Sequence, residues 1–382
     1  MQFSNRILVR ALLWSVGSVL VLAAEPPITR VSVEQFTKAA ADLARDSDAD
    51  AAQHLAALEL SERIGLSRLS HILSTMPGEK SRTALMLVAD KAAFMDPPAG
   101  DIGEEPTPDA AATRAMLVKV VNYVNTTNHQ LPNLMAERTT TGFEDRPNED
   151  VVEATGVVSY SYLPLHWVGR STVTVTYRDR KEVVDEKAGK EKKEGAGIGG
   201  LVTSGEFGPI LGIVVGDALK GKITWARWER GNGQRVAVFG FDVPEQKSNY
   251  RVQFCCVVQG YASDGNPEME KFDERTGYHG EIAFNPEDGS VLRLTATADM
   301  PPGGLVPHAG FAIEYGPMDI GGRSYICPLH GLATLQAHTT HQQAAISRSA
   351  YRGKAKTFLN DISFSKYRRF GSEMRIVPAA EQ

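Results

Sequence analysis

Cysteine is scarce in this chain. Three cysteines occur among 382 residues, at Cys255, Cys256 and Cys327, which excludes a small disulfide-rich scaffold and allows one disulfide at most. Neighbouring side chains of a strand point to opposite faces, so Cys255 and Cys256 cannot both reach Cys327. The pattern favours a Cys256–Cys327 bridge, and the alternative is three small buried apolar side chains.

Basic residues are not in excess, and several catalytic motifs are missing. The net charge is -5, which argues against a nucleic-acid partner because phosphate contacts require a clustered basic surface. No Gly-x-Ser-x-Gly elbow occurs, so Ser204 is a poor hydrolase nucleophile. A phosphate-binding glycine loop and a dinucleotide fingerprint are also lacking, and we expect no cofactor.

Long apolar runs are confined to the N-terminus. Residues 1–24 have the layout of a signal peptide, with Arg6 and Arg10 before an apolar run and small residues at Ala23 and Ala24. The alternative is an uncleaved membrane anchor, but the run is shorter than the roughly 20 residues that a spanning helix needs. We therefore expect a periplasmic or secreted protein with no transmembrane segment after cleavage.

Helical periodicity dominates residues 25–98. Ser32 and Gln35 form a capping box, and apolar residues then recur at helical spacing toward Arg45. Further helices are expected over 48–59, 66–76 and 80–95. These helices could offer a groove to a protein partner, or their apolar stripes could simply form a core. Residues 99–108, rich in glycine, proline and acidic side chains, predict a linker.

Residues 109–378 predict one helix followed by an antiparallel sheet. The helix carries Met116, Val120 and Val124 on one side, and beyond Leu134 the period changes from helical to alternating. Residues 178–195 are highly charged and predict a solvated hairpin tip. The glycine-rich apolar insertion 195–219 is expected to cover one face of the sheet. Expected strands cover 171–177, 223–230, 235–243, 250–259, 278–284, 291–298, 311–318, 323–327, 332–340 and 362–370. The predicted fold class is α+β, with an N-terminal helical region packed on a large curved antiparallel β-sheet.

Four short segments of the chain are distinctive: Leu131-Pro132-Asn133, Phe254-Cys255-Cys256, the run from Gly277 to Ile282, and the run from Tyr325 to Pro328. In these segments the chain resembles an uncharacterised family of exported acidobacterial proteins. This resemblance implies an exported protein and no particular mechanism. The hairpin from Gly280 to Leu294 also resembles the curved sheet of periplasmic lipoprotein carriers, which implies an apolar cavity suited to an acyl chain.

The leading functional hypothesis is therefore a binding or envelope-associated protein that encloses an apolar small molecule or lipid. Five residues of the insertion and the neighbouring strands are the candidate ligand contacts: Phe207, Ile210, Leu211, Trp225 and Phe254. Trp225 and Trp228 lie on opposite faces of one strand, so at most one can face a cavity, and core packing is the alternative role for each. Glu206, just before a predicted helix, is expected to cap it.

Two enzymatic alternatives stay open. His279 and Glu281 share one face of a strand and could act as an acid–base pair of a hydrolase. His338 and His341, with His330 upstream, could bind a metal if they lay on a helix, but on a strand this spacing places them on opposite faces. Strand is favoured there. A binding protein requires a continuous apolar cavity beneath 210–219 without converging ionisable groups, whereas an enzyme requires a cleft in which a histidine and a carboxylate meet within hydrogen-bond reach.

Overall fold

The computed structural model describes residues 28–153, 156–178, 181–184, 201, 205–231, 234–261, 267–339, 341–343 and 350–369. The predicted signal peptide and most of 195–204 lie outside these residues. Within them, no helix has the length and apolar character needed to cross a membrane.

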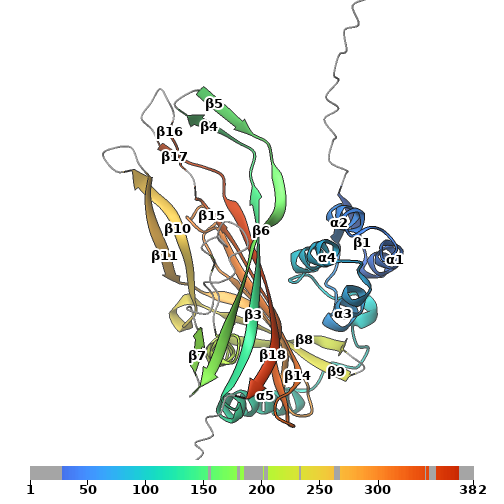
Figure 1. Cartoon of the computed structure of the whole chain (residues 1–382). Helices are drawn as coiled ribbons and strands as arrows, with labels where there is room; N and C mark the ends of the chain where they lie inside the picture. Colours follow the sequence, from blue (N-terminus) through green and yellow to red (C-terminus); the bar gives the residue numbers. More distant parts are fainter. Residues whose placement is uncertain are drawn as a thin grey trace, which may run out of the picture.

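A ten-stranded sheet is the centre of the molecule (Figure 1). All its neighbouring strands are antiparallel, and their order is β7-β6-β3-β18-β15-β14-β13-β12-β9-β8. The strands are β3 (Leu134–Arg146), β6 (Leu163–Arg178), β7 (Lys181–Val184), β8 (Lys222–Gly231), β9 (Gln234–Val243), β12 (Tyr278–Phe284), β13 (Val291–Ala298), β14 (His308–Asp319), β15 (Ser324–Ala337) and β18 (Lys356–Arg369). The predicted α+β class, with a helical N-terminal region and a large antiparallel sheet, is confirmed.

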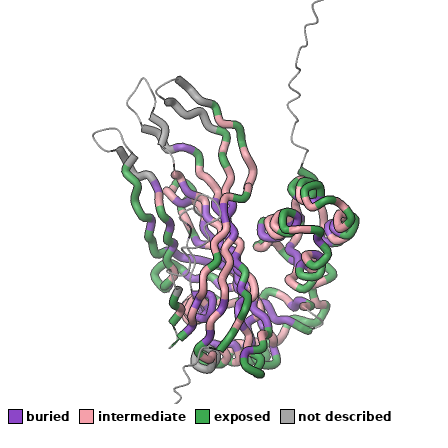
Figure 2. Tube along the Cα trace, viewed as in Figure 1, coloured by how far each residue is buried: buried purple, intermediate pink, exposed green. Residues whose placement is uncertain are grey.

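Alternation along the strands gives the sheet two buried faces. On β12, Tyr278, Ile282 and Phe284 belong to the largest apolar core, whereas His279 and Glu281 point the other way. We call the first side the inner face and the second the outer face. Buried positions run along the middle of the sheet, and a separate set lies inside the N-terminal helices (Figure 2).

The inner face is covered by two helices and a hairpin. The helices α5 (Ala110–Gln130) and α6 (Pro209–Ala218) contribute Met116, Val120 and Val214 to the core formed with the sheet. The hairpin of β10 (Arg251–Tyr261) and β11 (Pro267–Arg275) packs its apolar side chains over β14, β15 and β18. Three further small sheets pair β1 (Thr29–Val31) with β2 (Leu58–Leu60), β4 (Glu149–Glu153) with β5 (Gly156–Tyr160), and β16 (His341–Gln343) with β17 (Ala350–Arg352).

The outer face carries the N-terminal helical region. Its helices are α1 (Val33–Leu43), α2 (Asp48–Ala56), α3 (Leu66–Thr75) and α4 (Glu79–Lys91), which share a core of their own. The capping box at Ser32 and Gln35 is present. The predicted helix over 48–59 ends early because Leu58–Leu60 pairs with β1 as a parallel strand. Residues 80–95 are helical only as far as Lys91.

The predicted linker is held along the edge strand β8. The short helix η1 (Ala99–Asp101) begins it, and the backbone N–H of Gly103 then donates to the carbonyl of Trp228 at 2.9 Å. The indole N–H of Trp228 donates in turn to the carbonyl of Pro106 at 3.1 Å. This segment therefore connects the N-terminal helical region to α5 while it lies against β8. A second short helix, η3 (Glu245–Lys247), leads into β10.

Two strand predictions need correction. Residues 323–327 and 332–340 belong to a single strand, β15, which continues through Pro328. Pro328 is tolerated because the ladder with β14 shifts register beside it and the pairing with β18 begins only at His330. The strand β11 was not predicted, because its sequence Pro-Glu-Met-Glu-Lys-Phe-Asp-Glu-Arg is dominated by charged residues.

The predicted bridge between Cys256 and Cys327 is absent. Cys255 and Cys256 are bonded to each other, while Cys327 is a free thiol buried in the core between β15, β18 and Phe207. The sequence argument assumed an unbroken alternation along β10, but its pairing with β11 shifts register between Phe254 and Val257.

Candidate functional site

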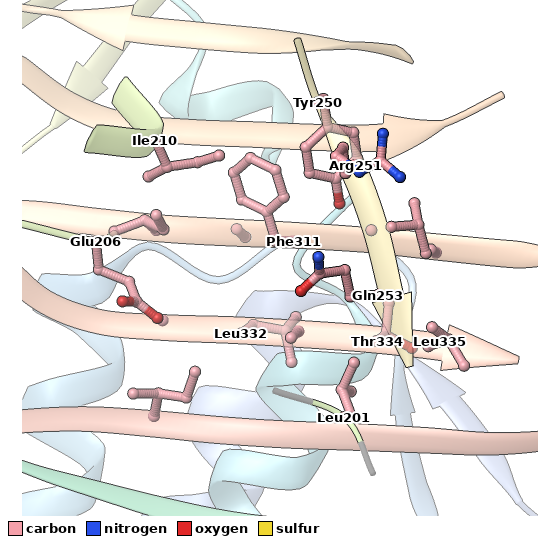
Figure 3. Close-up of a pocket in the computed structure, with 18 of the residues that line it drawn as sticks. Leu201, Glu206, Ile210, Tyr250, Arg251, Gln253, Phe311, Leu332, Thr334 and Leu335 are labelled. Atoms are coloured by element: carbon pink, nitrogen blue, oxygen red, sulfur yellow. The ribbon is translucent and has the colours of Figure 1, made fainter. Parts of the chain in front are cut away.

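A cavity of about 290 Å³ lies between the inner face and the hairpin strand β10. Its floor is formed by β14 and β15, with Ile362 from β18, and α6 contributes Ile210 and Ile213 at one end. Figure 3 shows Phe311 projecting from a floor strand toward β10, which crosses above it. Most of the wall is aliphatic or aromatic, as expected of a site that binds by excluding water.

The strand β10 forms the roof and one polar rim of this cavity. Tyr250 and Val252 are roof residues, and the Tyr250 ring lies 5.7 Å from the Phe311 ring, centre to centre. Arg251 and Gln253 at the rim both bond to Asp273 of β11, at 2.7 and 3.0 Å. The cationic group at this rim is therefore already paired within the hairpin.

Glu206 forms the opposite end of the cavity (Figure 3). Its residue is only 3 % exposed, and neither carboxylate oxygen has a hydrogen-bond partner among the described residues. Gly205 precedes it with a φ of 94°, a conformation that glycine adopts without strain. This turn places Glu206 beside the start of α6 without capping the helix, since neither of its carboxylate oxygens accepts a hydrogen bond from the described residues. The expected capping role is therefore wrong.

A second carboxylate and one arginine accompany Glu206. Arg138 of β3 places Nη1 3.6 Å from Oε1 of Glu182 and 3.9 Å from Oε2 of Glu206. The backbone N–H of Gly205 also donates to Glu182 at 3.0 Å. Burial, reinforced by the neighbouring Glu206, raises the pKa of Glu182 to about 7. Two carboxyl groups thus share one arginine, and one proton is partly retained near neutral pH.

Tyr315 completes this polar end. Its hydroxyl is buried without a hydrogen-bond partner among the described residues. Burial, and then the charge of Glu206, raise the pKa of the Tyr315 hydroxyl well above its usual range. The hydroxyl is therefore a neutral donor or acceptor at any physiological pH.

The predicted ligand residues lie in different places. Ile210 lines the cavity. Phe207 packs edge-on against Phe364 at 5.3 Å in the core below β3 and β18, and Leu211 packs in the core that α6 shares with the sheet. Trp225 contacts Trp228 and Phe254 contacts Phe358, with ring centres 4.6 and 5.0 Å apart. The expectation that the two tryptophans lie on opposite faces is wrong, because the register shift between Trp225 and Arg227 puts both in the inner core. These four residues pack in the cores around the cavity and do not line it.

Sequence reasoning missed Glu182 because its surroundings suggested a solvated hairpin tip. The side chain is only 4 % exposed and faces the inner side from β7. The available signal was the neighbouring pair Val183 and Val184, because β-branched residues favour a strand at this point of the charged run.

The outer face carries a separate network of buried charges beneath the helical region. Glu229 of β8 accepts hydrogen bonds from Arg63 of the helical region at 3.0 Å and from Arg293 at 2.9 Å. Arg227 links the same carboxylate to Glu281, at 2.8 and 2.6 Å. Burial alone would raise the pKa of Glu229, but the three arginines together lower it to about 2. This network fixes how the helical region sits on the sheet.

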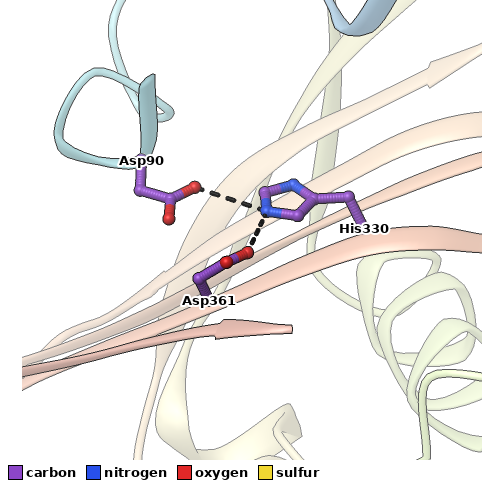
Figure 4. A group of neighbouring side chains, drawn as sticks. All are labelled: Asp90, His330 and Asp361. Carbon is purple, nitrogen blue, oxygen red and sulfur yellow. Dashed lines mark hydrogen bonds and ion pairs between the residues drawn. The ribbon is translucent and has the colours of Figure 1, made fainter. Parts of the chain in front are cut away.

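A histidine between two aspartates extends this contact toward β18 (Figure 4). The Nε2 atom of His330 lies 2.8 Å from Asp361 and 3.4 Å from Asp90 of α4. Burial alone would lower the pKa of His330, but the hydrogen bond that its Nε2–H donates to Asp361 and the charge of Asp90 raise it to about 9. Among the described residues, these three side chains place their possible ligand atoms close enough together to hold a metal ion. A protonated imidazole offsets the charge of one of the two carboxylates.

The predicted His279 and Glu281 pair does not form. Both line a polar cavity of about 330 Å³ between residues 93–96 and the outer face. His279 instead contacts Asp299, with Nδ1 2.8 Å from Oδ1. Glu281 is held by Arg227 through two hydrogen bonds of 2.6 and 2.7 Å. The alternation of the strand placed the two residues on one face, yet each is engaged by a different partner.

The predicted metal pair, His338 and His341, is described only in part. His338 directly follows β15, and its Nδ1 lies 2.5 Å from the carbonyl oxygen of Gly353. His341 begins the short strand β16, and its side chain lies outside the described atoms.

No protein-family model matches the chain, and no curated protein matches it. Three solved structures are similar over most of their own length. They are a LolA superfamily protein from Nitrosomonas europaea (8% identity, TM-score 0.25, 69% of this chain and 96% of that one), a putative outer membrane lipoprotein-sorting protein domain from Vibrio parahaemolyticus (10%, 0.24, 69% and 95%), and a DUF1329 family protein from Desulfovibrio piger (7%, 0.23, 70% and 95%). These TM-scores are too low to establish a shared function.

Proposed function

We propose that this protein is an envelope-associated carrier or binding protein that holds an apolar ligand, such as a lipid chain, in the cavity between the inner face and β10. The observation that carries this proposal is the apolar wall of that cavity, built from Phe311, Ile313, Ala333 and Leu335 and closed over by β10. Replacing the water in such an apolar cavity with an apolar ligand lowers the free energy of the system.

The size and composition of the cavity fit this function. Its volume of about 290 Å³ lies near the lower end of the range for small-molecule sites, roughly 300–1,000 Å³. The cavity expected beneath 210–219 corresponds to the part that Ile210 and Ile213 of α6 line. The expectation that no ionisable groups converge there is wrong, because Glu206 lines the cavity with Glu182 and Arg138 beside it. One slim chain fits such a space better than a large ring system.

The enzymatic alternative is supported less well. The polar cavity on the outer face brings His279 to Asp299, but the only hydroxyl side chains among its lining residues are Thr295 and Thr297. An acid–base pair without an evident nucleophile among the described residues leaves the reaction undefined.

The protein-interaction alternative is also supported less well. The helical region closes its own core, and its large exposed apolar side chains include Phe94 and Ile102, which are isolated from one another. Scattered apolar residues of this kind are normal on a soluble surface.

A fluorescent apolar probe tests the proposed function. We expect N-phenyl-1-naphthylamine to gain fluorescence on binding the full chain, and Ile213→Trp to weaken its affinity at least about tenfold by filling the cavity. Leu219→Trp is the matched control, because Leu219 follows the same helix, is exposed and does not line this cavity. Equal binding by the two variants, or no binding by the unmodified chain, would overturn the proposal.

A further inference from the structure

The carboxylate at the closed end of the cavity limits the chemistry of the ligand. Glu206 is buried in an otherwise apolar wall, and its two oxygens lack hydrogen-bond partners among the described residues. A buried acceptor without a donor costs on the order of 1–3 kcal/mol, and more when it is charged. A protein that retains such a group in a ligand cavity gains most from a ligand that supplies the missing donor.

The charges around Glu206 do not supply it. Arg138 is shared with Glu182, and its Nη1 atom is 3.9 Å from the nearer Glu206 oxygen, too far for a hydrogen bond. The Glu182 carboxylate competes for the same guanidinium at 3.6 Å. Two acidic groups face one basic group, so the site is neutral or negative and does not attract an anion.

The other end of the cavity does not attract an anion either. Arg251 at the rim bonds to Asp273 at 2.7 Å, and Gln253 bonds to the same carboxylate. A carboxylate or phosphate group entering there would have to displace Asp273 from both. Among the described residues, neither end therefore offers an uncompensated cation to an anionic head group.

We propose that the ligand is an amphiphile with one apolar chain and a terminal group that donates a hydrogen bond to Glu206, namely a hydroxyl or an ammonium, and not a carboxylate or phosphate. This inference rests on the proposed binding function and adds the class of head group. An ammonium forms a charge-assisted hydrogen bond with Glu206, and a hydroxyl forms a neutral-donor bond to the same oxygen.

Probes that share one chain and differ only at the head group test the inference. Dodecylamine, 1-dodecanol and dodecanoate are each titrated against the bound naphthylamine probe, using the full chain at neutral pH. We expect the amine and the alcohol to displace the probe at concentrations at least about tenfold lower than dodecanoate. If dodecanoate competes as well as the other two, the head-group inference is wrong while the binding function stands.

Variants locate the preference. Glu206→Gln should reduce the advantage of dodecylamine over dodecanoate at least about fivefold, since the neutral amide no longer attracts the ammonium. Glu287→Gln removes an exposed carboxylate on the far hairpin and should leave the advantage unchanged. An unchanged advantage in Glu206→Gln would also refute the inference. If the naphthylamine probe itself does not bind the unmodified chain, the binding function fails, and this outcome is distinct from a loss of preference.

Discussion

His330 shows how the neighbours of a buried group decide its charge. The imidazole is only 14 % exposed and would lose its proton if burial acted alone. Asp361, Asp90 and Glu314 surround it with negative charge, while Arg63 and Arg293 line the same small space. The carboxylates prevail, so the folded protein holds a proton that the unfolded chain would release near neutral pH.

The folded state should therefore lose stability as the pH rises. The pKa of His330 is about 9 in the folded protein and 6.5 as an ordinary histidine. Its contribution is fully present below 6.5 and is lost as the pH rises through 9; the raised pKa of Asp90, caused by burial and then by Asp361, acts in the same direction. We expect urea denaturation to show a loss on the order of 2 kcal/mol between pH 6.5 and 9.5.

The variant His330→Gln isolates this contribution. Its unfolding free energy should vary less with pH over this range than that of the unmodified chain. His279→Gln serves as the control, because His279 also contacts an aspartate but is 56 % exposed. Parallel pH profiles for His330→Gln and the unmodified chain would show that His330 is not the group responsible.

For single residues, strand alternation predicted the face of the sheet but not the partner of the side chain. The spacing of His279 and Glu281 placed them on one face, but their partners Asp299 and Arg227 come from other strands. The same limit explains Glu206, whose local sequence resembles a helix cap and whose burial depends on Arg138 and Glu182 across the sheet. Long-range contacts of this kind leave no periodic signal in the sequence.

At the scale of elements, the hairpin between β12 and β13 shows why one glycine is required. Gly289 has a φ of 79°, and a Cβ atom there would lie 2.5 Å from the carbonyl oxygen of Lys119 in α5. The Lys119 ammonium also donates to the carbonyl of Pro286 in the same turn at 2.9 Å. The absent side chain lets the hairpin approach the helix that covers the inner face.

Gly289→Ala should lower the unfolding free energy by more than about 1 kcal/mol, because it introduces both backbone strain and a clash with α5. Chemical denaturation measures this change. Gly100→Ala is the matched control: Gly100 has open space around its Cα, so the substitution should change stability little. A loss no larger than that of the control would mean that α5 moves away at little cost.

Elements with a clear period were predicted well, and the others were not. The amphipathic helices of the N-terminal region and the hairpin around Asn285 to Gly289 follow their patterns. The strand β11 and the continuous β15 do not, because pairing with β10 stabilises a charged segment and a register shift accommodates Pro328. Tertiary pairing overrides local propensity in both cases.

At the scale of the whole molecule, two cores meet through charged side chains. The helical region has a core of its own, and its contact with the sheet includes Arg63 with Glu229 and Asp90 with His330. The sequence predicted the two regions and the order in which they follow. It could not predict that their contact is ionic, because the charges come from positions 166 residues apart in the case of Arg63 and Glu229.

Removing one of these charges should loosen the helical region without unfolding it. In Arg63→Met, Glu229 keeps Arg293 and Arg227, so the carboxylate stays compensated while the bond between the two regions is lost. We expect cleavage after Glu104 or Glu105 by a glutamate-specific protease to become at least about fivefold faster, since opening of the contact frees the segment beside β8.

Lys91→Met is the control for this experiment, because the exposed pair of Lys91 and Glu59 lies within the helical region. Circular dichroism would verify that both variants keep their helices. Equal cleavage rates in the two variants would indicate that apolar contacts, and not Arg63, hold the regions together.

The lone thiol of Cys327 has a chemical consequence. Burial raises its pKa to about 12, so hardly any thiolate exists at neutral pH, and the thiolate is the form that oxidants and alkylating reagents attack. The folded protein should keep this sulfur in its reduced form through long exposure to air. Its modification would record the moments at which the layer around Phe207 comes apart.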